Sequence, residues 1–105
     1  METWKVIEFA NTYEVSNLGR IRNRITKKVL KPFASKTHPT LRVTLMRNNT
    51  NEKYSVSQIV FNHWCLKNGD RATYYWFNGF NVKNNRIGHL DGDKTNNKAN
   101  NLYRY

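Results

Sequence analysis

Apolar and polar residues alternate along two segments in the N-terminal half of the chain, residues 19–25 and 41–47. Alternation with a period of two is typical of a β-strand with one buried face, because successive side chains of a strand point to opposite sides. The apolar faces consist of Ile21 and Ile25 in the first segment and of Leu41, Val43 and Leu45 in the second. The pattern therefore predicts two amphipathic strands.

Shorter segments extend this pattern on both sides. Residues 4–9, 29–33 and 53–56 can each supply a further short strand. Turns are predicted before the first alternating segment, at residues 17–19 (Asn-Leu-Gly), and after the second, at residues 47–51 (Arg-Asn-Asn-Thr-Asn). We therefore expect residues 4–56 to form a small antiparallel β-meander with one basic face.

The period changes at residue 57. Residues at helical spacing follow it, namely Ile59, Val60, His63 and Trp64. Ser57 is the expected N-cap, because its hydroxyl can accept a hydrogen bond from a free backbone N–H of the first turn. The helix should end before residues 68–70, whose Asn-Gly-Asp sequence favours a turn. Since His63 lies on the apolar face of this helix, we do not expect it to serve a site.

Two features near and beyond the helix are more readily structural than functional. Cys65 stands between Trp64 and Leu66, which favours a buried thiol. Residues 74–77 form an aromatic cluster, Tyr-Tyr-Trp-Phe, which in so small a chain favours a place in the core. If exposed, the cluster could stack on bases or form an apolar patch for a protein partner.

The net charge of the chain limits the classes of partner that it is expected to bind. The 105 residues include 18 Lys and Arg against seven Asp and Glu, a formal net charge of +11. Such an excess favours a polyanionic partner, usually nucleic acid, and excludes an acidic mimic of DNA. Residues 15–51 contain no acidic residue but half of the basic ones. Bound phosphates would explain why like charges stand side by side there. The predicted phosphate contacts are Arg20, Arg22, Arg24, Lys27, Lys28, Lys31, Arg42 and Arg47.

Other classes are excluded by what the sequence contains. A single cysteine allows neither an internal disulfide nor a zinc site built from cysteines. No apolar run of 18 residues is present, so we expect no membrane span and no membrane partner. The N-terminal residues lack the basic and then apolar pattern of a signal peptide. We therefore expect an intracellular protein.

Three groups of residues resemble a known family in order and spacing. Trp4, Ile7, residues 13–17 (Tyr-Glu-Val-Ser-Asn) and 19–21 (Gly-Arg-Ile) resemble the NUMOD4 module, and residues 56–64 the helix that precedes an HNH nuclease core. The C-terminal elements resemble the core of phage-type HNH homing endonucleases: His89-Leu90-Asp91-Gly92, then Asn96-Asn97, then Asn101-Leu102. The resemblance implies an α+β fold: a NUMOD4-like basic β-module (residues 1–52), then an HNH-like module (53–105). The second module would hold a helix and an incomplete ββα-metal hairpin.

The resemblance also implies roles for two residues. His89 would be the general base that activates water, and Asn101 would support the loop that carries it. Active members use a divalent cation, here Mg²⁺ or Mn²⁺. The residue before the histidine is commonly an Asp that binds this metal, but here it is Gly88. Ser57 replaces a histidine of the relatives, and the sequence stops at Tyr105, before the family's last metal-binding helix. We therefore assign no metal ligands.

Two functions remain open. We favour a nucleic-acid-binding protein of HNH ancestry that is catalytically inactive, acting as a DNA-binding regulator or as an inhibitor of a nucleic-acid machine, for instance in phage counter-defence. The alternative is an active, metal-dependent DNA-nicking endonuclease. In both cases we expect DNA more than RNA as the partner, a phage gene as the source, and no resident cofactor unless the metal site is active. A host complex that itself binds nucleic acid is a further candidate partner.

Overall fold

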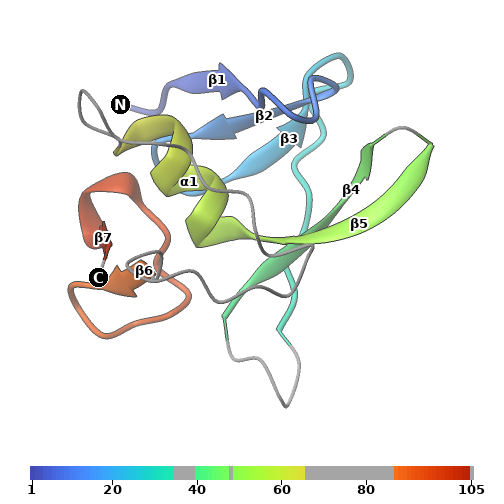
Figure 1. The fold of residues 1–105 in the computed structure, drawn as a ribbon. Coiled ribbons are helices and arrows are strands. Elements are labelled where there is room, and N and C mark those ends of the chain that lie inside the picture. Colours follow the sequence, from blue (N-terminus) through green and yellow to red (C-terminus); the bar gives the residue numbers. More distant parts are fainter. Residues whose placement is uncertain (35–39, 48, 66–86, 105) are drawn as a thin grey trace.

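The computed structural model describes residues 1–34, 40–47, 49–65 and 87–104, and it contains three small antiparallel sheets and one α-helix in this part of the chain (Figure 1). The strands are β1 (Trp4–Val6), β2 (Tyr13–Ser16), β3 (Ile21–Asn23), β4 (Arg42–Arg47), β5 (Thr50–Ser55), β6 (Ile87–His89) and β7 (Leu102–Arg104). The helix is α1 (Val56–Trp64), and a short 3-10 turn, Ala99–Asn101, precedes β7. The predicted α+β class with antiparallel strands is confirmed.

The first sheet has the order β1-β2-β3. Strand β1 is shorter than the predicted strand over residues 4–9, because a tight turn follows it, in which the carbonyl of Ile7 accepts from the N–H of Ala10 (3.2 Å). The central strand β2 was not expected from the hydrophobic pattern. Strand β3 ends at Asn23, so Ile25 lies beyond it and is 77% exposed. The prediction that Ile25 shares the buried face of Ile21 is therefore wrong.

The predicted strand over residues 29–33 does not form. Only its two ends pair, Val29 with Arg22 and Phe33 with Arg42. Pro32 lies between them and has no N–H to donate, so a regular ladder cannot continue through it. The segment instead passes from the first sheet to the β4–β5 pair, and the expected single meander is in fact two separate sheets.

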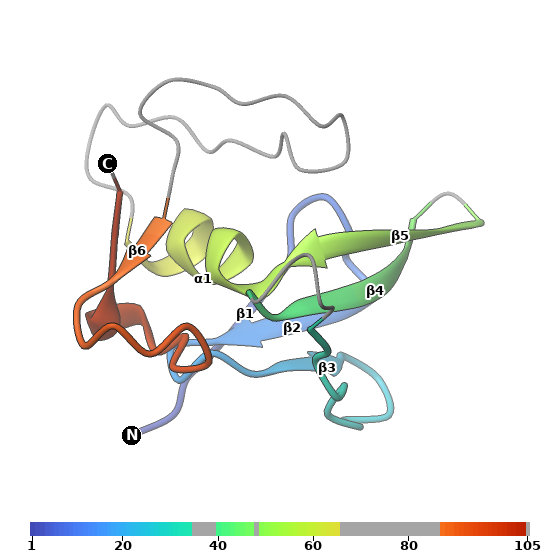
Figure 2. The same ribbon diagram turned by 90° about the horizontal axis from the view of Figure 1, so that it is seen from below.

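The β4–β5 hairpin follows its hydrophobic pattern. Val43 and Leu45 are buried, as alternation predicted. Arg47 pairs directly with Thr50, so the turn is tighter than the predicted 47–51. Asn49 within it has φ +62°, a left-handed conformation that Asn tolerates better than most residues. The hairpin extends to one side of the molecule, away from β6 and β7 (Figures 1 and 2).

Helix α1 begins two residues earlier than expected. Ser55 is its N-cap residue, whereas Ser57 lies inside the helix and is buried. The predicted cap at Ser57 is wrong because Val56 must turn into the core as β5 ends; its N–H donates to the carbonyl of Leu41 (3.1 Å) and its side chain is 2% exposed. The hydroxyls of Ser55 and Ser57 hydrogen-bond to each other (2.9 Å).

One buried cluster joins most of these elements. It contains Ile7 and Val15 from the N-terminal part, Tyr54 and Ile59 from β5 and α1, and Leu102 from β7. The helix packs against β2 on one side and against β6 and β7 on the other (Figures 1 and 2). The predicted boundary between residues 52 and 53 falls within β5, and the division into two modules stays a prediction.

The remaining expectations concern single features. Cys65 is only half-buried, but desolvation raises the pKa of its thiol and Sγ donates to the carbonyl of Ala99 (3.3 Å). The aromatic cluster at residues 74–77 and the turn at 68–70 lie outside the described residues. In the described part of the chain no helix is both long and apolar enough to span a membrane.

Candidate nucleic-acid interface and HNH-like loop

The loop between β6 and β7 is organised by Asn101. Its Nδ2 donates to Oδ1 of Asp91 (3.0 Å) and to the carbonyl of Asn96 (2.8 Å), while its Oδ1 accepts from the N–H of Asp91 (3.1 Å). Asn101 is 7% exposed, so these bonds are shielded from water. Asn101 therefore connects both halves of the loop, and its supporting role in a site at His89 stays a prediction.

The carboxylate of Asp91 accepts several hydrogen bonds within this loop. Asn96 Nδ2 donates to its Oδ2 (2.8 Å), and the N–H of Asp93 donates to its Oδ1 (2.8 Å). These donors, with Asn101, lower the pKa of Asp91 to about 2, because each stabilises the charged form. Asp91 thus serves the loop as an anionic acceptor, and its oxygens are already engaged.

His89 is the last residue of β6 and is half-buried. Its Nε2 lies 2.8 Å from Oδ1 of Asn97, a residue that is 5% exposed. An amide oxygen can only accept, so this contact places the imidazole proton on Nε2 and leaves Nδ1 as the basic nitrogen. Among the described residues Nδ1 has no hydrogen-bond partner. The geometry allows His89 to accept a proton there.

Gly88 stands where many active relatives carry a metal-binding Asp. A Cβ built on Gly88 would lie 2.3 Å from Cζ of Tyr103, the residue opposite it in β7. The tyrosine ring therefore covers the position of any side chain at residue 88. With Asp91 engaged by its neighbours, and no group of three His, Cys, Asp or Glu side chains suited to a metal in the described part of the chain, these residues do not fit a divalent cation.

Three of the predicted phosphate-binding residues have carboxylate partners. Arg20 Nε donates to Glu2 (2.8 Å), Arg22 Nε donates to Glu14 (2.9 Å), and Lys27 Nζ lies 3.4 Å from the same Glu14 oxygen. These acids stand outside the acid-free segment, but the β-sheet brings them to it, since Glu14 pairs directly with Arg22 across β2 and β3. The adjacent basic residues thus do not need bound phosphate to be tolerated, contrary to our expectation.

Arg22 is further held by an aromatic ring. Its guanidinium lies 3.8 Å from the ring centroid of Trp4, and that of Arg20 lies 5.5 Å from the same ring. Arginine stacks readily on indole because its planar cation is weakly hydrated. Trp4 was singled out only as part of a motif, and its contact with both arginines depends on the pairing of β1 with β2.

The other predicted basic residues fall into two groups. Arg42 and Arg47 are half-buried: Arg42 lies 5.7 Å from the ring centroid of Phe33, and Arg47 interacts with Tyr54. Arg24, Lys28 and Lys31 are exposed, and within the described residues none of them forms an ion pair. Arg24 Nε donates to the carbonyl of Asn11 (2.8 Å), which holds one edge of its guanidinium group.

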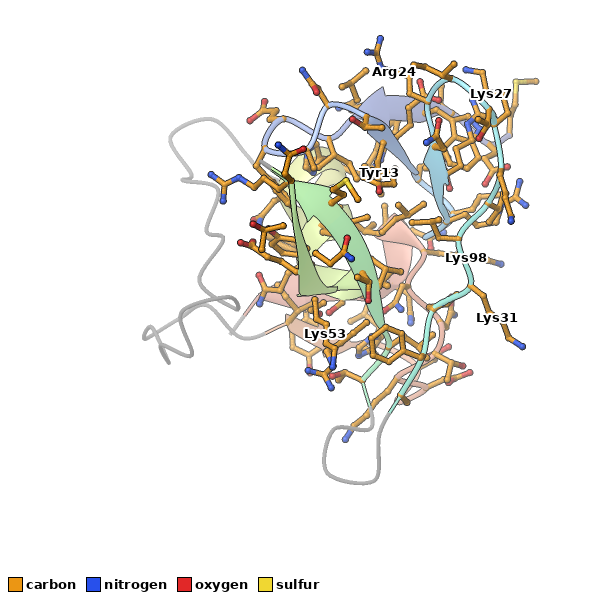
Figure 3. The ribbon with its side chains drawn as sticks, turned by 90° about the vertical axis from the view of Figure 1, so that its right-hand side faces the viewer. Tyr13, Arg24, Lys27, Lys31, Lys53 and Lys98 are labelled. Atoms are coloured by element: carbon orange, nitrogen blue, oxygen red, sulfur yellow. The ribbon has the colours of Figure 1, made fainter. Side chains whose placement is uncertain are left out.

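The exposed cations gather beyond β3. In Figure 3, Arg24 and Lys27 lie at the turn that follows β3, and Lys31 and Lys98 lie further along the same edge of that view. Lys98 comes from the C-terminal loop and was not predicted, because its neighbourhood in the sequence is polar and nearly neutral. We call Arg24, Lys27, Lys28 and Lys31 the basic edge.

Hydrogen bonds to Asn23 hold the turn of the basic edge. Asn23 Oδ1 accepts from the N–H groups of Ile25 (2.9 Å) and Thr26 (3.0 Å), and the Asn23 carbonyl accepts from Lys27 (2.9 Å). Lys27 adopts φ +62° within this turn. The exposed Ile25 is thus held at a defined place among cations, a position that the alternating pattern had assigned to the core.

The fold, with its basic β-sheet and its histidine-bearing hairpin, is similar to that of a solved HNH homing endonuclease. A profile of the NUMOD4 motif matches residues 2–46. An uncharacterized HNH endonuclease of Acanthamoeba polyphaga mimivirus is 34% identical over 99 residues, which cover 94% of this chain and 26% of the relative. The chain is thus similar to HNH endonucleases over nearly its whole length and carries an N-terminal NUMOD4 motif, as the sequence resemblance predicted. A phage origin stays a prediction.

A solved structure supports the same relationship. The HNH homing endonuclease I-HmuI, whose structure describes DNA binding and cleavage by that enzyme, matches with a TM-score of 0.74 and 25% sequence identity. The match covers 98% of this chain and 52% of that one. The chain thus spans about a quarter of the viral relative and about half of the homing endonuclease.

Proposed function

We propose that this chain binds duplex DNA through the basic edge. The observation that carries this proposal is the set of exposed cations beyond β3, of which Arg24, Lys28 and Lys31 have no acidic partner among the described residues. Cations without internal partners are the ones that gain most from phosphates, because binding then releases condensed counterions without breaking an ion pair. The relationship to a homing endonuclease that binds DNA supports DNA over RNA.

Ile25 gives this edge an apolar element. Its side chain is 77% exposed at the tip of the turn, between Arg24 and Lys27. Proteins that enter the DNA minor groove often place an apolar side chain against the base steps while flanking cations hold the phosphates. We propose the same arrangement here, with the hydrogen-bonded Asn23 turn presenting Ile25 to a groove.

We propose further that the HNH-like loop, as built from the described residues, does not cleave DNA, so that the chain acts as a DNA-binding regulator or as an inhibitor of a nucleic-acid machine. Two features support this: the Tyr103 ring over Gly88 and the engaged carboxylate of Asp91. The second candidate is metal-dependent nicking with Mg²⁺ or Mn²⁺, which is favoured by Asn101 and by Nδ1 of His89, an atom with no hydrogen-bond partner in the described part of the chain.

Binding is tested by measuring DNA affinity over a series of salt concentrations. The double variant Lys28→Ala/Lys31→Ala should bind more weakly, with a salt slope reduced by about 2, because each lost phosphate contact lowers the slope by about 0.9. Lys94→Ala is the matched control, since Lys94 is exposed but lies in the acidic loop with Asp91 and Asp93. Equal slopes for the wild type and the double variant would exclude the basic edge as the binding surface.

Catalysis is tested separately with supercoiled plasmid and Mg²⁺ or Mn²⁺. We expect no metal-dependent nicking above the level of His89→Ala. Nicking by the wild type that this substitution abolishes would establish the second candidate instead.

A further inference from the structure

The N-terminal motif and the HNH-like loop meet at one close contact. The N–H of Ala99 donates to the carbonyl of Asn17 (2.8 Å). Beside it, Gly19 has φ +87°, and a Cβ on Gly19 would lie 2.6 Å from the carbonyl oxygen of Asn97. Only glycine combines this backbone conformation with this approach. The turn over residues 16–20 is thus seated against the backbone of Asn97.

That turn is itself firmly held. The hydroxyl of Ser16, a fully buried residue, accepts from the N–H groups of Leu18 (3.2 Å) and Arg20 (3.1 Å). The side chain of Asn17 accepts from the N–H of Thr3 (2.8 Å) and donates to the carbonyl of Met1 (3.3 Å). The surface on which Asn97 rests is therefore preorganised by the N-terminal part of the chain.

Asn97 in turn holds the imidazole ring of His89. Its side-chain oxygen is the partner of His89 Nε2 (2.8 Å), and Asn97 itself is buried. The imidazole is held at one nitrogen while the other stays basic. Asn101, by contrast, makes no hydrogen bond to the ring of His89 and acts on the loop backbone and on Asp91.

We propose that Asn97 is the positioning residue of His89, and that the Gly19 turn of the NUMOD4 motif sets the place of Asn97. Asn97 selects the tautomer with the proton on Nε2, so that Nδ1 is the nitrogen that accepts a proton from water or a hydrogen bond from another donor. The proposal rests on the proposed HNH site but not on catalysis. It also makes the N-terminal motif a structural part of that site as well as a DNA-binding element.

The tautomer of His89 can be measured directly from the ¹⁵N chemical shifts of its ring nitrogens, at alkaline pH where the imidazole is neutral. In the wild type, Nε2 should be the protonated nitrogen. Asn97→Ala should produce a mixture of both tautomers, and Asn97→Asp should restore the wild-type shifts, because a carboxylate oxygen accepts the same hydrogen bond. A wild-type ring protonated on Nδ1, or shifts unchanged in Asn97→Ala, would overturn the proposal.

The role of the Gly19 turn can be tested with a matched pair of variants. Gly19→Ala and Gly92→Ala both place a side chain at positive φ, but a Cβ on Gly92 meets nothing within 4 Å. We expect Gly19→Ala to alter the His89 ring shifts and Gly92→Ala to leave them unchanged, although Gly92 is much closer to His89 in the sequence. A larger change of the His89 ring shifts in Gly92→Ala than in Gly19→Ala, or equal changes in the two variants, would refute the coupling between the Gly19 turn and His89. This pair also decides the question if Asn97→Ala does not fold.

DNA binding distinguishes this inference from the proposed function. If the basic-edge variants leave affinity unchanged while the tautomer responds as expected, the proposed function fails and the inference stands. If the basic-edge variants weaken binding while the tautomer does not respond to Asn97 or Gly19, only the inference fails.

Discussion

The ring of Tyr103 lies over Gly88, directly across the β6–β7 pair, and leaves no room there for a Cβ. The blocking atoms are Cζ and Oη, the far end of a side chain in a residue that is 42% exposed. The ring can therefore move aside at moderate cost, unlike the backbone carbonyl that faces Gly19. Residue 88 is thus limited by one side chain rather than by the fold.

This relationship predicts that the effect of Gly88→Ala on the free energy of unfolding changes sign when the Tyr103 ring is removed. Gly88→Ala should lower the free energy of unfolding by about 1 kcal/mol, at the low end for an overpacked site. In a Tyr103→Ala background the same substitution should raise it by about 0.5 kcal/mol, because alanine loses less backbone entropy than glycine on entering a strand. A double-mutant cycle by chemical denaturation measures both values. Equal effects in the two backgrounds would contradict the blocking role of Tyr103.

His63 predicts a pH dependence of stability. Its Nδ1 donates to the carbonyl of Ile59 (2.8 Å), and its Nε2 accepts from the N–H of Glu8 (3.2 Å), so both nitrogens are used in the neutral form. Desolvation lowers the pKa of His63 below its ordinary value of 6.5. The unfolded chain therefore takes up the proton more readily, and stability should fall as the pH drops below about 6.5, by at most about 1.4 kcal/mol per pH unit.

The measurement is the unfolding free energy between neutral and mildly acidic pH. His63→Gln removes the titrating group, so its stability should depend less on pH than that of the wild type. His89→Gln is the control and should keep the contribution of His63. If His63→Gln has the full wild-type pH dependence, the neutral, doubly bonded imidazole is not what stabilises the contact between α1 and Glu8.

The lowered pKa of Asp91 predicts a second pH dependence of stability, at acidic pH. Its pKa of about 2 lies below the ordinary value of 3.8, so the carboxylate stabilises the fold above about pH 4, and this contribution is lost as the pH falls towards 2. An NMR titration of the Asp91 carboxyl should show the low value. Asn96→Ala removes the first of its donors and should move the titration to higher pH. An Asp91 that titrates near its ordinary value in the wild type would contradict the loop geometry.

Ile25 predicts a loss of binding without a loss of stability. Because the side chain is exposed, Ile25→Ala should change the unfolding free energy by less than about 0.5 kcal/mol. If the side chain enters a groove, DNA affinity should fall by about 1 kcal/mol, roughly fivefold in Kd. Val6→Ala is the control, since Val6 is also exposed but lies on β1, the opposite edge of the sheet from β3. Equal affinity of the two variants would remove Ile25 from the interface.

The hydrophobic pattern of the sequence correctly predicted the buried side chains in segments that bury one face. The alternation over residues 41–47 correctly predicted which side chains of β4 are buried, and helical spacing correctly placed Ile59 and Val60 in the core. It failed at Ile25, because alternation continues in the sequence after the strand has ended. Asn23 ends the strand by capturing the following N–H groups, and such a side-chain contact leaves no periodic signal.

The sequence by itself determined the resemblance to HNH endonucleases, the α+β class, the excess of positive charge and the candidacy of His89 and Asn101. All of these depend on residue types and on short spacings, which the chain carries whether or not it is folded. Only the tertiary structure decided which cations keep no acidic partner, since β2 brings Glu14 to Arg22 and Lys27. It likewise decided that Tyr103 covers Gly88 and that Gly19 supports Asn97, contacts between residues 15 and 78 positions apart in the chain. Contacts over such distances depend on how sheets and loops pack, and no local pattern specifies them.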